Sequence, residues 1–480
     1  MKLTDRRKFI GTVGRATLAV AGSSMFFPLI QGCNGGAGNR RPPNIVFILS
    51  DDQGWNQVGY HGFPYYQTPN IDRISQEGIY FTDAYSASPV CSPTRASIMT
   101  GKNPARLHIT DYIPGGLFPY APLRSPAIRP YLPIELTILP QVLKKQGYVT
   151  GHFGKWHLSP DRHFDAAGRF FDPQYRGFDD VLVNVKPDED HDPFDDPHHV
   201  EAITLRSLRF LEENHDKPFF MYVSHHVVHR PLIEQPDLIT KYEAMPGADR
   251  PDRNPIMGAM IERMDEGIGR ILQKLDDLDL TGNTIVIFVS DNGGLEALQS
   301  QAPLRGGKAM VFEGGIRVPM CIRWPGVINP GTVSGVPVIS DDFFPTLLEI
   351  AGMRPDLAEL DGVSLLPLIK GTGDIERDAL YWHYPHYHHL GYKPGGAIRV
   401  GDYKLIEWYE ETMWGLPNQI NLYNVREDIG ETTDLSDQLP ELAAEMREKL
   451  HRWRRAVNAQ EMIRNPHYDP DRVHVRLGAM

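Results

Sequence analysis

Two pairs of polar residues with oxygen ligands follow two short apolar segments of the chain. Asp51 and Asp52 follow the segment NIVFILS, and Asp291 and Asn292 follow TIVIFVS. All four side chains offer oxygen and three are negative, which suits a hard divalent cation, calcium or magnesium, better than zinc. Either pair alone would be explained by a turn or a helix cap after a strand. Two such pairs after two buried strands favour a cation site.

A further candidate, Cys91, lies at the start of a predicted helix. Pro93, in the segment CSPTRASIMTG, pre-sets a first helical turn, where backbone N–H groups favour an anion, and Arg95 follows within one turn. By itself, Cys91 could be a thiolate nucleophile or a small buried apolar residue. A thiolate beside a cation and several carboxylates makes little chemical sense, so the nucleophile needs another form.

The segment from Cys91 to Gly101 resembles the C-x-P-[ST]-R-x4-T-G signature of the type I sulfatases, arylsulfatase-like members of the alkaline phosphatase superfamily. In that family the cysteine is oxidised after translation to formylglycine. The resemblance continues, in family order, over nearly the whole chain that follows the N-terminal segment. The other matching segments are Asp51–Gly54, Gly154–His157, Ser290–Gly294, Leu304–Lys308, Glu313–Pro319, Leu422–Asn424 and 428–431.

The resemblance implies a metal site and a nucleophile. The ligands that it implies for calcium, or for magnesium as the alternative, are Asp51, Asp52, Cys91, Asp291 and Asn292. Cys91, as hydrated formylglycine (3-oxoalanine), would attack sulfur with one hydroxyl and expel sulfate by collapse of the other. The cation would ease ionisation of the hydroxyl and neutralise sulfate oxygens. Arg95 would fix the modified side chain.

Four further residues obtain roles from the resemblance. Lys155 and Lys308 would bind sulfate oxygens through charge-assisted hydrogen bonds. His157 would accept the proton that is released on collapse, and His229 would act as a general acid near the leaving oxygen. Val228 stands where many members have proline, which leaves the reach of His229 less defined.

The elements that must position these residues alternate along the chain. Short β-branched or aromatic runs, typical of strands buried on both faces of a parallel sheet, lie at 44–49, 219–223 and 284–289. Segments of helical periodicity lie at 69–76, 138–146 and 255–275. This alternation predicts an α/β fold with a large, mostly parallel sheet flanked by helices. Ligands bind outside the carboxyl ends of such strands, where the polar pairs lie.

The pattern of the sequence changes near residue 376. Shorter aromatic strands are predicted at 379–384, 397–400, 403–408 and 420–423, with a helix at 440–456. We therefore predict a catalytic domain over 43–375 and a smaller α+β subdomain with an antiparallel sheet over 376–480. The aromatic and histidine-rich segment 381–389 is either an edge strand and turn or a wall of the substrate cleft. Cys321, in an apolar run, is predicted to be a core residue.

The first 33 residues have the order of an export signal. Arg6 and Arg7 precede an apolar stretch, 16–30, which is shorter than the roughly 20 residues that span a bilayer. The arginine pair resembles a twin-arginine signal, and the sequence LIQGC resembles a lipobox that would attach a lipid to Cys33. Residues 34–42 would form a tether. We expect an exported bacterial protein in the periplasm or cell envelope, held at a membrane through Cys33.

Composition limits the partners. The 480 residues carry a formal charge of −12, and −16 remains once 1–33, with five basic residues and one acidic residue, are removed. A nucleic-acid partner bound through a broad basic surface is therefore not expected. We expect the substrate to be a sulfated glycan, either a polysaccharide or an oligosaccharide, that binds in a local cationic pocket. Candidates for that pocket outside the motifs are Arg106, His108, Arg124, Arg129 and the segment 381–389.

Two other functions are compatible with these residues. A hydrolase of phosphate or phosphonate monoesters would use the same cation and oxygen nucleophile. A non-catalytic glycan-binding lipoprotein would keep the binding site without turnover. Besides the glycan substrate and the membrane, the enzyme hypothesis requires one more partner, a formylglycine-generating maturation enzyme that acts on Cys91.

Overall fold

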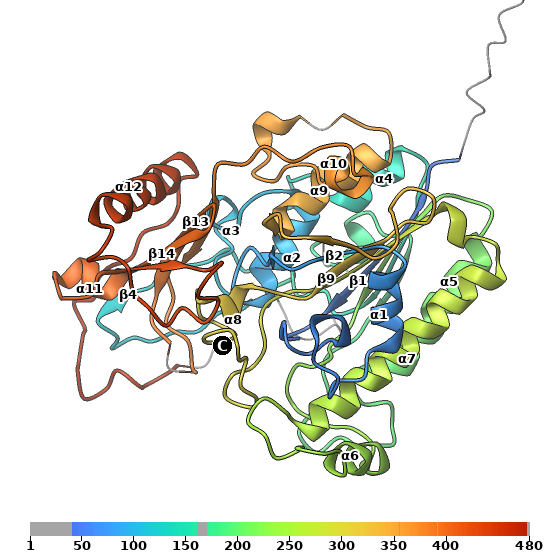
Figure 1. Ribbon diagram of the computed structural model, residues 1–480, viewed down its shortest axis with the longest axis horizontal. Coiled ribbons are helices and arrows are strands. Elements are labelled where there is room, and N and C mark those ends of the chain that lie inside the picture. Colours follow the sequence, from blue (N-terminus) through green and yellow to red (C-terminus); the bar gives the residue numbers. More distant parts are fainter. Residues whose placement is uncertain (1–40, 161–169, 355, 391, 478–480) are drawn as a thin grey trace, which may run out of the picture. The chain divides into compact units, whose positions relative to one another are not determined.

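The computed structural model describes residues 41–160, 170–354, 356–390 and 392–477 (Figure 1). The predicted export signal, the lipobox with Cys33 and the predicted tether up to residue 40 lie outside these ranges. No helix within the described ranges is both long and apolar enough to cross a bilayer.

A mixed sheet of eight strands, in the order β10-β2-β9-β8-β1-β7-β5-β6, forms the centre of the fold. All its strands run parallel except β9, which is antiparallel to β8 and β2. The strands are β1 (Asn44–Ser50), β2 (Ile79–Phe81), β5 (Val149–Gly154), β6 (Asp180–Val183), β7 (Phe219–Ser224), β8 (Thr284–Ser290), β9 (Met320–Arg323) and β10 (Thr332–Ser334). The predicted mostly parallel sheet is confirmed.

The three strands predicted from sequence are neighbours at the centre of this sheet. β1 lies between β7 and β8, with Leu49 opposite Ser224 and Ser50 opposite Ser290. Their carboxyl ends are therefore level. The polar residues that follow each strand start from one edge of the sheet.

Helices cover both faces of the sheet (Figure 1). Alternate side chains of β1 point to opposite faces: Phe47 and Leu49 belong to one apolar core, and Val46 and Ile48 to the other. Helices of the first core are α2 (Cys91–Thr100), α4 (Leu139–Lys145) and α9 (Phe343–Ile350). Helices of the second are α1 (Pro69–Gln76), α5 (Val200–Asn214) and α7 (Pro255–Asp277). The helices predicted at 69–76, 138–146 and 255–275 correspond to α1, α4 and α7.

A separate antiparallel sheet follows, as predicted. Its strands, in spatial order, are β12 (Leu380–Tyr384), β13 (Gly395–Val400), β14 (Tyr403–Trp408) and β15 (Ile420–Asn424). Helix α12 (Pro440–Ala456) packs on one face through Met446 and Leu450. The other face, with Trp382, shares a core with Val90, the residue before Cys91. Residues 41–480 form one compact unit, and the boundary at 375 stays a prediction.

Short elements complete the described chain. The remaining α-helices are α3 (Pro104–Leu107), α6 (Pro236–Glu243), α8 (Glu313–Ile316), α10 (Leu366–Lys370) and α11 (Tyr409–Trp414). The remaining strands are β3 (Ala84–Tyr85), β4 (Leu123–Arg124), β11 (Val338–Ile339) and β16 (Ile463–Arg464). β3 pairs with β11, and β4 pairs with β16 near the C-terminus. Cys321, on β9, is fully buried in the second core, as predicted.

A buried carboxylate on β14 holds α12 against the antiparallel sheet. Glu407 is 0% exposed and forms ion pairs of 2.9–3.1 Å with Arg447, His451 and Arg454 of the helix. Burial alone would raise the pKa of Glu407, but the hydrogen bond from His451 and the arginine charges lower it to about 2. An ordinary glutamate titrates near 4.3, so this carboxylate favours the folded state above that pH.

We expect Glu407→Gln to lower the free energy of unfolding by about 3 kcal/mol at pH 7, because Arg447 and Arg454 lose their buried counter-charge and His451 loses its carboxylate partner. The difference from the parent protein should shrink as the pH falls from about 4.5 towards 2, where the parent carboxylate also becomes protonated. Denaturant unfolding of both proteins at several pH values measures this difference in the free energy of unfolding. Glu448→Gln, which breaks an exposed pair with Arg455, is the control and should cost less than about 0.5 kcal/mol. A loss that is equal for the two variants would contradict the prediction.

Candidate active site

The predicted ligands converge at the carboxyl edge of the central strands. Asp51 and Asp52 follow β1, Asp291 and Asn292 follow β8, and Cys91 is the first residue of α2. The ligand atoms of Asp51, Asp52, Cys91 and Asp291 lie within 4.8 Å of one another. All five residues are at most 1% exposed. Such a cluster could hold a metal ion.

The polar atoms of this cluster fit a cation that prefers oxygen. Asn292 uses its Nδ2 to donate to Asp52 Oδ1 at 2.8 Å, which turns its amide oxygen away from that bond. Asn292 Oδ1 and Asp51 Oδ1 are buried and have no hydrogen-bond partner among the described residues. Unpaired buried oxygens are costly unless another group satisfies them. Three carboxylates and an amide oxygen are ligands that calcium and magnesium prefer.

Arg95 ties the start of α2 to three strand ends. Its side chain is 1% exposed, and Nε and Nη2 lie 2.8 and 2.7 Å from Asp291 Oδ2. Nη1 donates to the Lys155 carbonyl at 3.0 Å and to the Ser224 hydroxyl at 2.6 Å. Arg95 therefore partly offsets the carboxylate charge and fixes the helix on which Cys91 lies.

The environment of Cys91 argues against a reactive thiolate. Its Sγ lies 3.7 Å from Lys308 Nζ and 4.0 Å from Asp52 Oδ1. Burial raises the pKa of the Cys91 thiol to about 12, although Lys155 and Lys308 act in the opposite direction. Without a bound cation, the unmodified thiol is therefore protonated at neutral pH.

Two lysines lie against the carboxylates next to Cys91. Lys155 Nζ is 2.6 Å from Asp51 Oδ2, and Lys308 Nζ is 2.7 Å from Asp52 Oδ2. Burial alone would lower the pKa of each lysine, but the carboxylates of Asp51 and Asp52 raise it above the ordinary value. Both ammonium groups are therefore charged at neutral pH and can bind an anion beside Cys91.

His157 is held as a neutral base. Its Nε2 lies 2.7 Å from the carbonyl oxygen of Ile113, which can only accept, so Nε2 carries the proton. Nδ1 is buried and has no partner in the part of the chain that the structure describes. Burial and the charge of Lys155 lower the pKa of His157 well below the ordinary value. Ile113 also donates its N–H to the Ser92 hydroxyl at 3.0 Å, which links His157 to the start of α2.

The backbone at two site residues is strained. His157 has a φ of 61° and Asp52 a φ of 60°, both in the left-handed region that side chains rarely adopt. Strain of this kind persists only when the surroundings impose it, and it is frequent at functional sites.

His229 lies at the rim of the same cluster. Its Nε2 is 3.8 Å from Asp52 Oδ2, and 24% of its side chain is exposed. Nδ1 is 2.7 Å from the carbonyl of Arg230 and so carries the proton. Burial, and then the charge of Lys308, lower the pKa of His229 to about 4. In this state Nε2 is an acceptor, and the predicted general acid would first have to gain a proton there.

Sequence reasoning missed the serines that end the central strands. Ser224, at the end of β7, accepts from Arg95, and Ser290, at the end of β8, accepts from the Gln53 N–H at 3.0 Å. Both hydroxyls position residues of the cluster. The signal was present, because β1, β7 and β8 all end in serine.

Most candidates outside the motifs serve the fold. Arg106 pairs with Asp361 at 2.7 Å, and His108 bonds the Asn458 carbonyl. In the segment 381–389, Tyr381 stacks on Trp453 with ring centroids 4.7 Å apart. His383 and His386 bond Tyr409 and Thr110. The interpretation of 381–389 as strand and turn therefore holds for all but its last residues.

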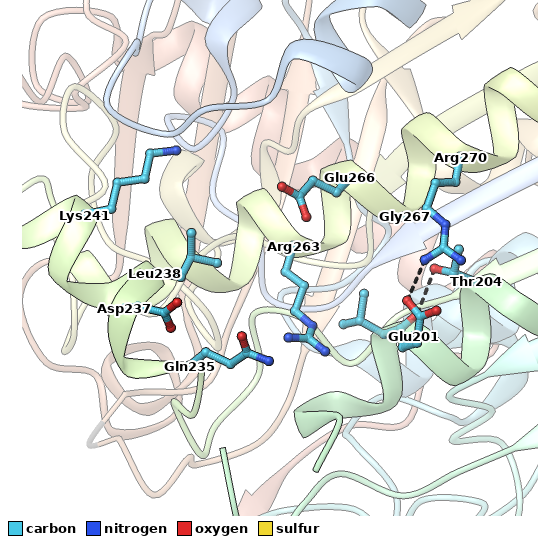
Figure 2. Close-up of a pocket in the computed structure, with 11 residues that line it drawn as sticks. Glu201, Thr204, Gln235, Asp237, Leu238, Lys241, Arg263, Glu266, Gly267 and Arg270 are labelled. Atoms are coloured by element: carbon cyan, nitrogen blue, oxygen red, sulfur yellow. Dashed lines mark hydrogen bonds and ion pairs between the residues drawn. The ribbon is translucent and has the colours of Figure 1, made fainter. Parts of the chain in front are cut away.

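A surface hollow elsewhere lies between helices α5, α6 and α7 (Figure 2). It measures about 360 Å³ and contains none of the site residues. Its basic side chains are paired with acids: Arg270 lies 2.5 Å from Glu201, Lys241 lies 2.6 Å from Glu262, and Arg263 lies 3.2 Å from Glu234. The hollow is a solvated, charge-balanced surface.

Comparison with known proteins agrees with this geometry. A family model described as Sulfatase matches residues 43–353, and one described as N-sulphoglucosamine sulphohydrolase, C-terminal, matches 307–456. A sulfatase of Formosa agariphila is 31% identical, covering 86% of this chain and 88% of the relative. Human arylsulfatase A is 32% identical, covering 76% and 74%.

Among solved structures, Ps i-CgsB in complex with k-i-k-neocarrahexaose superimposes with a TM-score of 0.74 at 25% identity, covering 89% of this chain and 95% of that one. The range 43–353 matched by the Sulfatase family model includes every residue of the buried cluster, and the two relatives each cover about three quarters or more of this chain. The chain therefore belongs to the sulfatase family, within the alkaline phosphatase-like superfamily, and is a sulfuric ester hydrolase.

Proposed function

We propose that this enzyme releases inorganic sulfate from a sulfated carbohydrate, with Cys91 converted to formylglycine and a divalent cation, calcium, held beside it. The observation that carries the proposal is the buried cluster of Asp51, Asp52, Cys91 and Asp291, with its unpartnered oxygens and its two adjoining lysines. When present, the cation would supply Lewis-acid chemistry, and the modified residue an oxygen nucleophile.

The residues of the chain would bind the sulfate and move protons around it. Lys155 and Lys308 would hold sulfate oxygens, since their charged Nζ atoms flank Cys91. His157 would accept a proton at Nδ1, the ring nitrogen left without hydrogen by its bond to Ile113. His229 would approach the leaving oxygen with Nε2, after a proton reaches that atom. Arg95 would keep residue 91 in place.

A carbohydrate substrate is supported by a structural neighbour. Ps i-CgsB was solved in complex with a carbohydrate, k-i-k-neocarrahexaose. The net charge of −12 opposes a polyanion at a distance, so the sulfate must be recognised by local cations such as Lys155 and Lys308.

The proposed location rests on the N-terminal sequence. The paired arginines, the short apolar stretch and the LIQGC segment support export and a lipid on Cys33, which would place the enzyme at a membrane surface in the periplasm or envelope. A formylglycine-generating enzyme would be the partner that matures Cys91.

The test is to produce the chain with a formylglycine-generating enzyme and calcium, incubate it with a panel of sulfated glycans and an aryl sulfate, and quantify sulfate and phosphate by ion chromatography. We expect sulfate release from at least one glycan and from the aryl sulfate, and a phosphatase activity on matched phosphate esters at least 100-fold lower. A preference for phosphate or phosphonate esters would instead support the alternative hydrolase. Binding of a glycan without release of either anion from converted protein would support the non-catalytic lipoprotein.

A further inference from the structure

Side chains from three distant segments meet beside the candidate active site. Tyr112 precedes Ile113, the residue that bonds both His157 and Ser92. The ring of Tyr112 lies 5.7 Å from that of His388 and 6.4 Å from that of His389, and the two histidine rings are 4.1 Å apart. Arg476 completes the group, with Nη2 2.7 Å from the Tyr112 hydroxyl. We call these four residues the rim cluster.

One member of the rim cluster is a buried donor in need of an acceptor. His388 is 3% exposed, and its Nδ1 accepts the N–H of Leu390 at 3.3 Å, so Nε2 carries the proton. That Nε2 has no hydrogen-bond partner among the described residues. A buried N–H without an acceptor costs free energy, and native structures retain such groups where a ligand can satisfy them.

A second member, Arg476, forms no close ion pair within the described chain, although its charge reaches the buried carboxyl of Asp111, the residue before Tyr112. Arg476 is exposed, and no carboxylate of the described residues lies within 4.0 Å of its guanidinium. The guanidinium donates instead to the neutral Tyr112 hydroxyl. Burial raises the pKa of Asp111 to about 7, although hydrogen bonds and the charge of Arg476 lower it, so this carboxyl is partly neutral and leaves the guanidinium able to bind an anion.

The rim cluster lies within electrostatic reach of the sulfate-binding lysine. Burial, and then the charges of Arg476, Lys308 and Arg230, lower the pKa of His389 to about 4. The same two residues, Lys308 and Arg476, act on His388. The charges of Lys308 and Arg476 therefore reach both imidazoles, and an anion bound at this cluster would be attracted by both cations.

We propose that the rim cluster is a subsite for the sugar that carries the scissile sulfate, in which His388 Nε2–H donates to a sugar oxygen and Arg476 binds a second anionic group of the substrate. This inference rests on the proposed function. It selects, among sulfated carbohydrates, those with a second sulfate or a carboxylate near the ester that is cleaved. Tyr112 and His389 would contact the sugar ring with their faces.

The test measures binding without turnover, in a Cys91→Ala background with calcium present. Calorimetry compares matched saccharides that carry one sulfate, two sulfates, or one sulfate and one carboxylate. We expect the parent to bind at least one doubly anionic saccharide about 10- to 100-fold more tightly than its monosulfated match, as for hydrogen bonds to charged groups. Arg476→Gln should reduce that preference to less than about 3-fold. The preferred probe distinguishes a sulfate from a carboxylate as the second anion.

Arg472→Gln is the matched control, because Arg472 lies four residues earlier and stacks on Tyr120 with its guanidinium 3.5 Å from the ring centroid. It should keep the preference. A parent without preference in any pair, a preference that survives Arg476→Gln, or an equal loss in the control would each overturn the subsite.

His388→Gln adds a second readout. We expect this variant to bind singly and doubly anionic saccharides about 10-fold more weakly, with an equal loss for both. Fully converted enzyme with the same substitution should keep its turnover of an aryl sulfate, which has no sugar. Equal loss on the aryl sulfate would assign His388 a structural role and refute its part in the subsite. Absence of sulfate release from every substrate, with the binding preference intact, would refute the proposed function and leave the binding site standing.

Discussion

Replacing Cys91 with alanine is expected to abolish sulfate release, with a loss of roughly 10⁴-fold or more in kcat, as is usual when a covalent nucleophile is removed. The reason is structural: Cys91 lies inside the cluster of Asp51, Asp52 and Asp291, and no other cysteine among the described residues reaches it. In the parent protein, the peptide from Ile74 to Arg95 should carry an aldehyde in place of the thiol. Mass spectrometry of that peptide and sulfate quantification measure the two results together.

Cys321→Ala is the matched control, since Cys321 is the other described cysteine and lies fully buried on β9, outside the cluster. It should keep activity within a few-fold and cost only modest stability. An active preparation in which the Cys91 thiol is intact would refute the formylglycine mechanism. Full activity of Cys91→Ala would refute any role of this residue as nucleophile.

Removal of divalent cations is expected to lower sulfate release by more than about 100-fold, and calcium should restore it. The same ion should stabilise the fold, because it binds only the native arrangement of three carboxylates and the Asn292 amide oxygen. At a hundredfold excess over its Kd, a ligand adds about 2.7 kcal/mol to the free energy of unfolding. Dialysis against a chelator, followed by activity and thermal unfolding with and without calcium, measures both effects.

The cation effect on stability has its own control variants. In Asp51→Asn the Tm should no longer rise with calcium, because this residue supplies an unpartnered oxygen to the cluster. Asp437→Asn, an exposed acid, should keep the full rise. A chelated enzyme that retains both activity and Tm would show that the cluster functions without a metal. Restoration by magnesium alone would assign the site to the smaller ion.

The sequence predicted the centre of the sheet because its strands are apolar on both faces. Residues 44–49, 219–223 and 284–289 read as buried strands, and they became β1, β7 and β8. β5 escaped prediction, since its sequence VTGHFG contains two glycines and a histidine and has no apolar run. The antiparallel direction of β9 could not be predicted either, because strand direction depends on pairing between distant segments.

Some residues of the candidate site could be predicted from the sequence and others could not. Residues within motifs at strand ends, such as Asp51 and Asp291, could be placed from sequence because β1 and β8 set their position. Residues whose role depends on tertiary neighbours could not. His388 lies in a segment that is mostly structural, and Arg476 meets Tyr112 across 364 positions of the chain. The protonated nitrogen of His157 depends likewise on the carbonyl of Ile113, which no local pattern indicates.

The depth of Cys91 has a consequence for the lifetime of a newly made chain. Because the side chain is 1% exposed and lies beneath two lysines, another protein could not reach it once the surrounding strands have assembled. The proposed conversion therefore competes in time with folding, and a chain that folds first stays permanently inactive. The fraction of converted molecules is then set at synthesis by the relative rates of conversion and folding, and later changes of temperature or cation would leave that fraction unaltered. Overproduction without added maturation enzyme should therefore yield well-folded molecules with a low, constant specific activity.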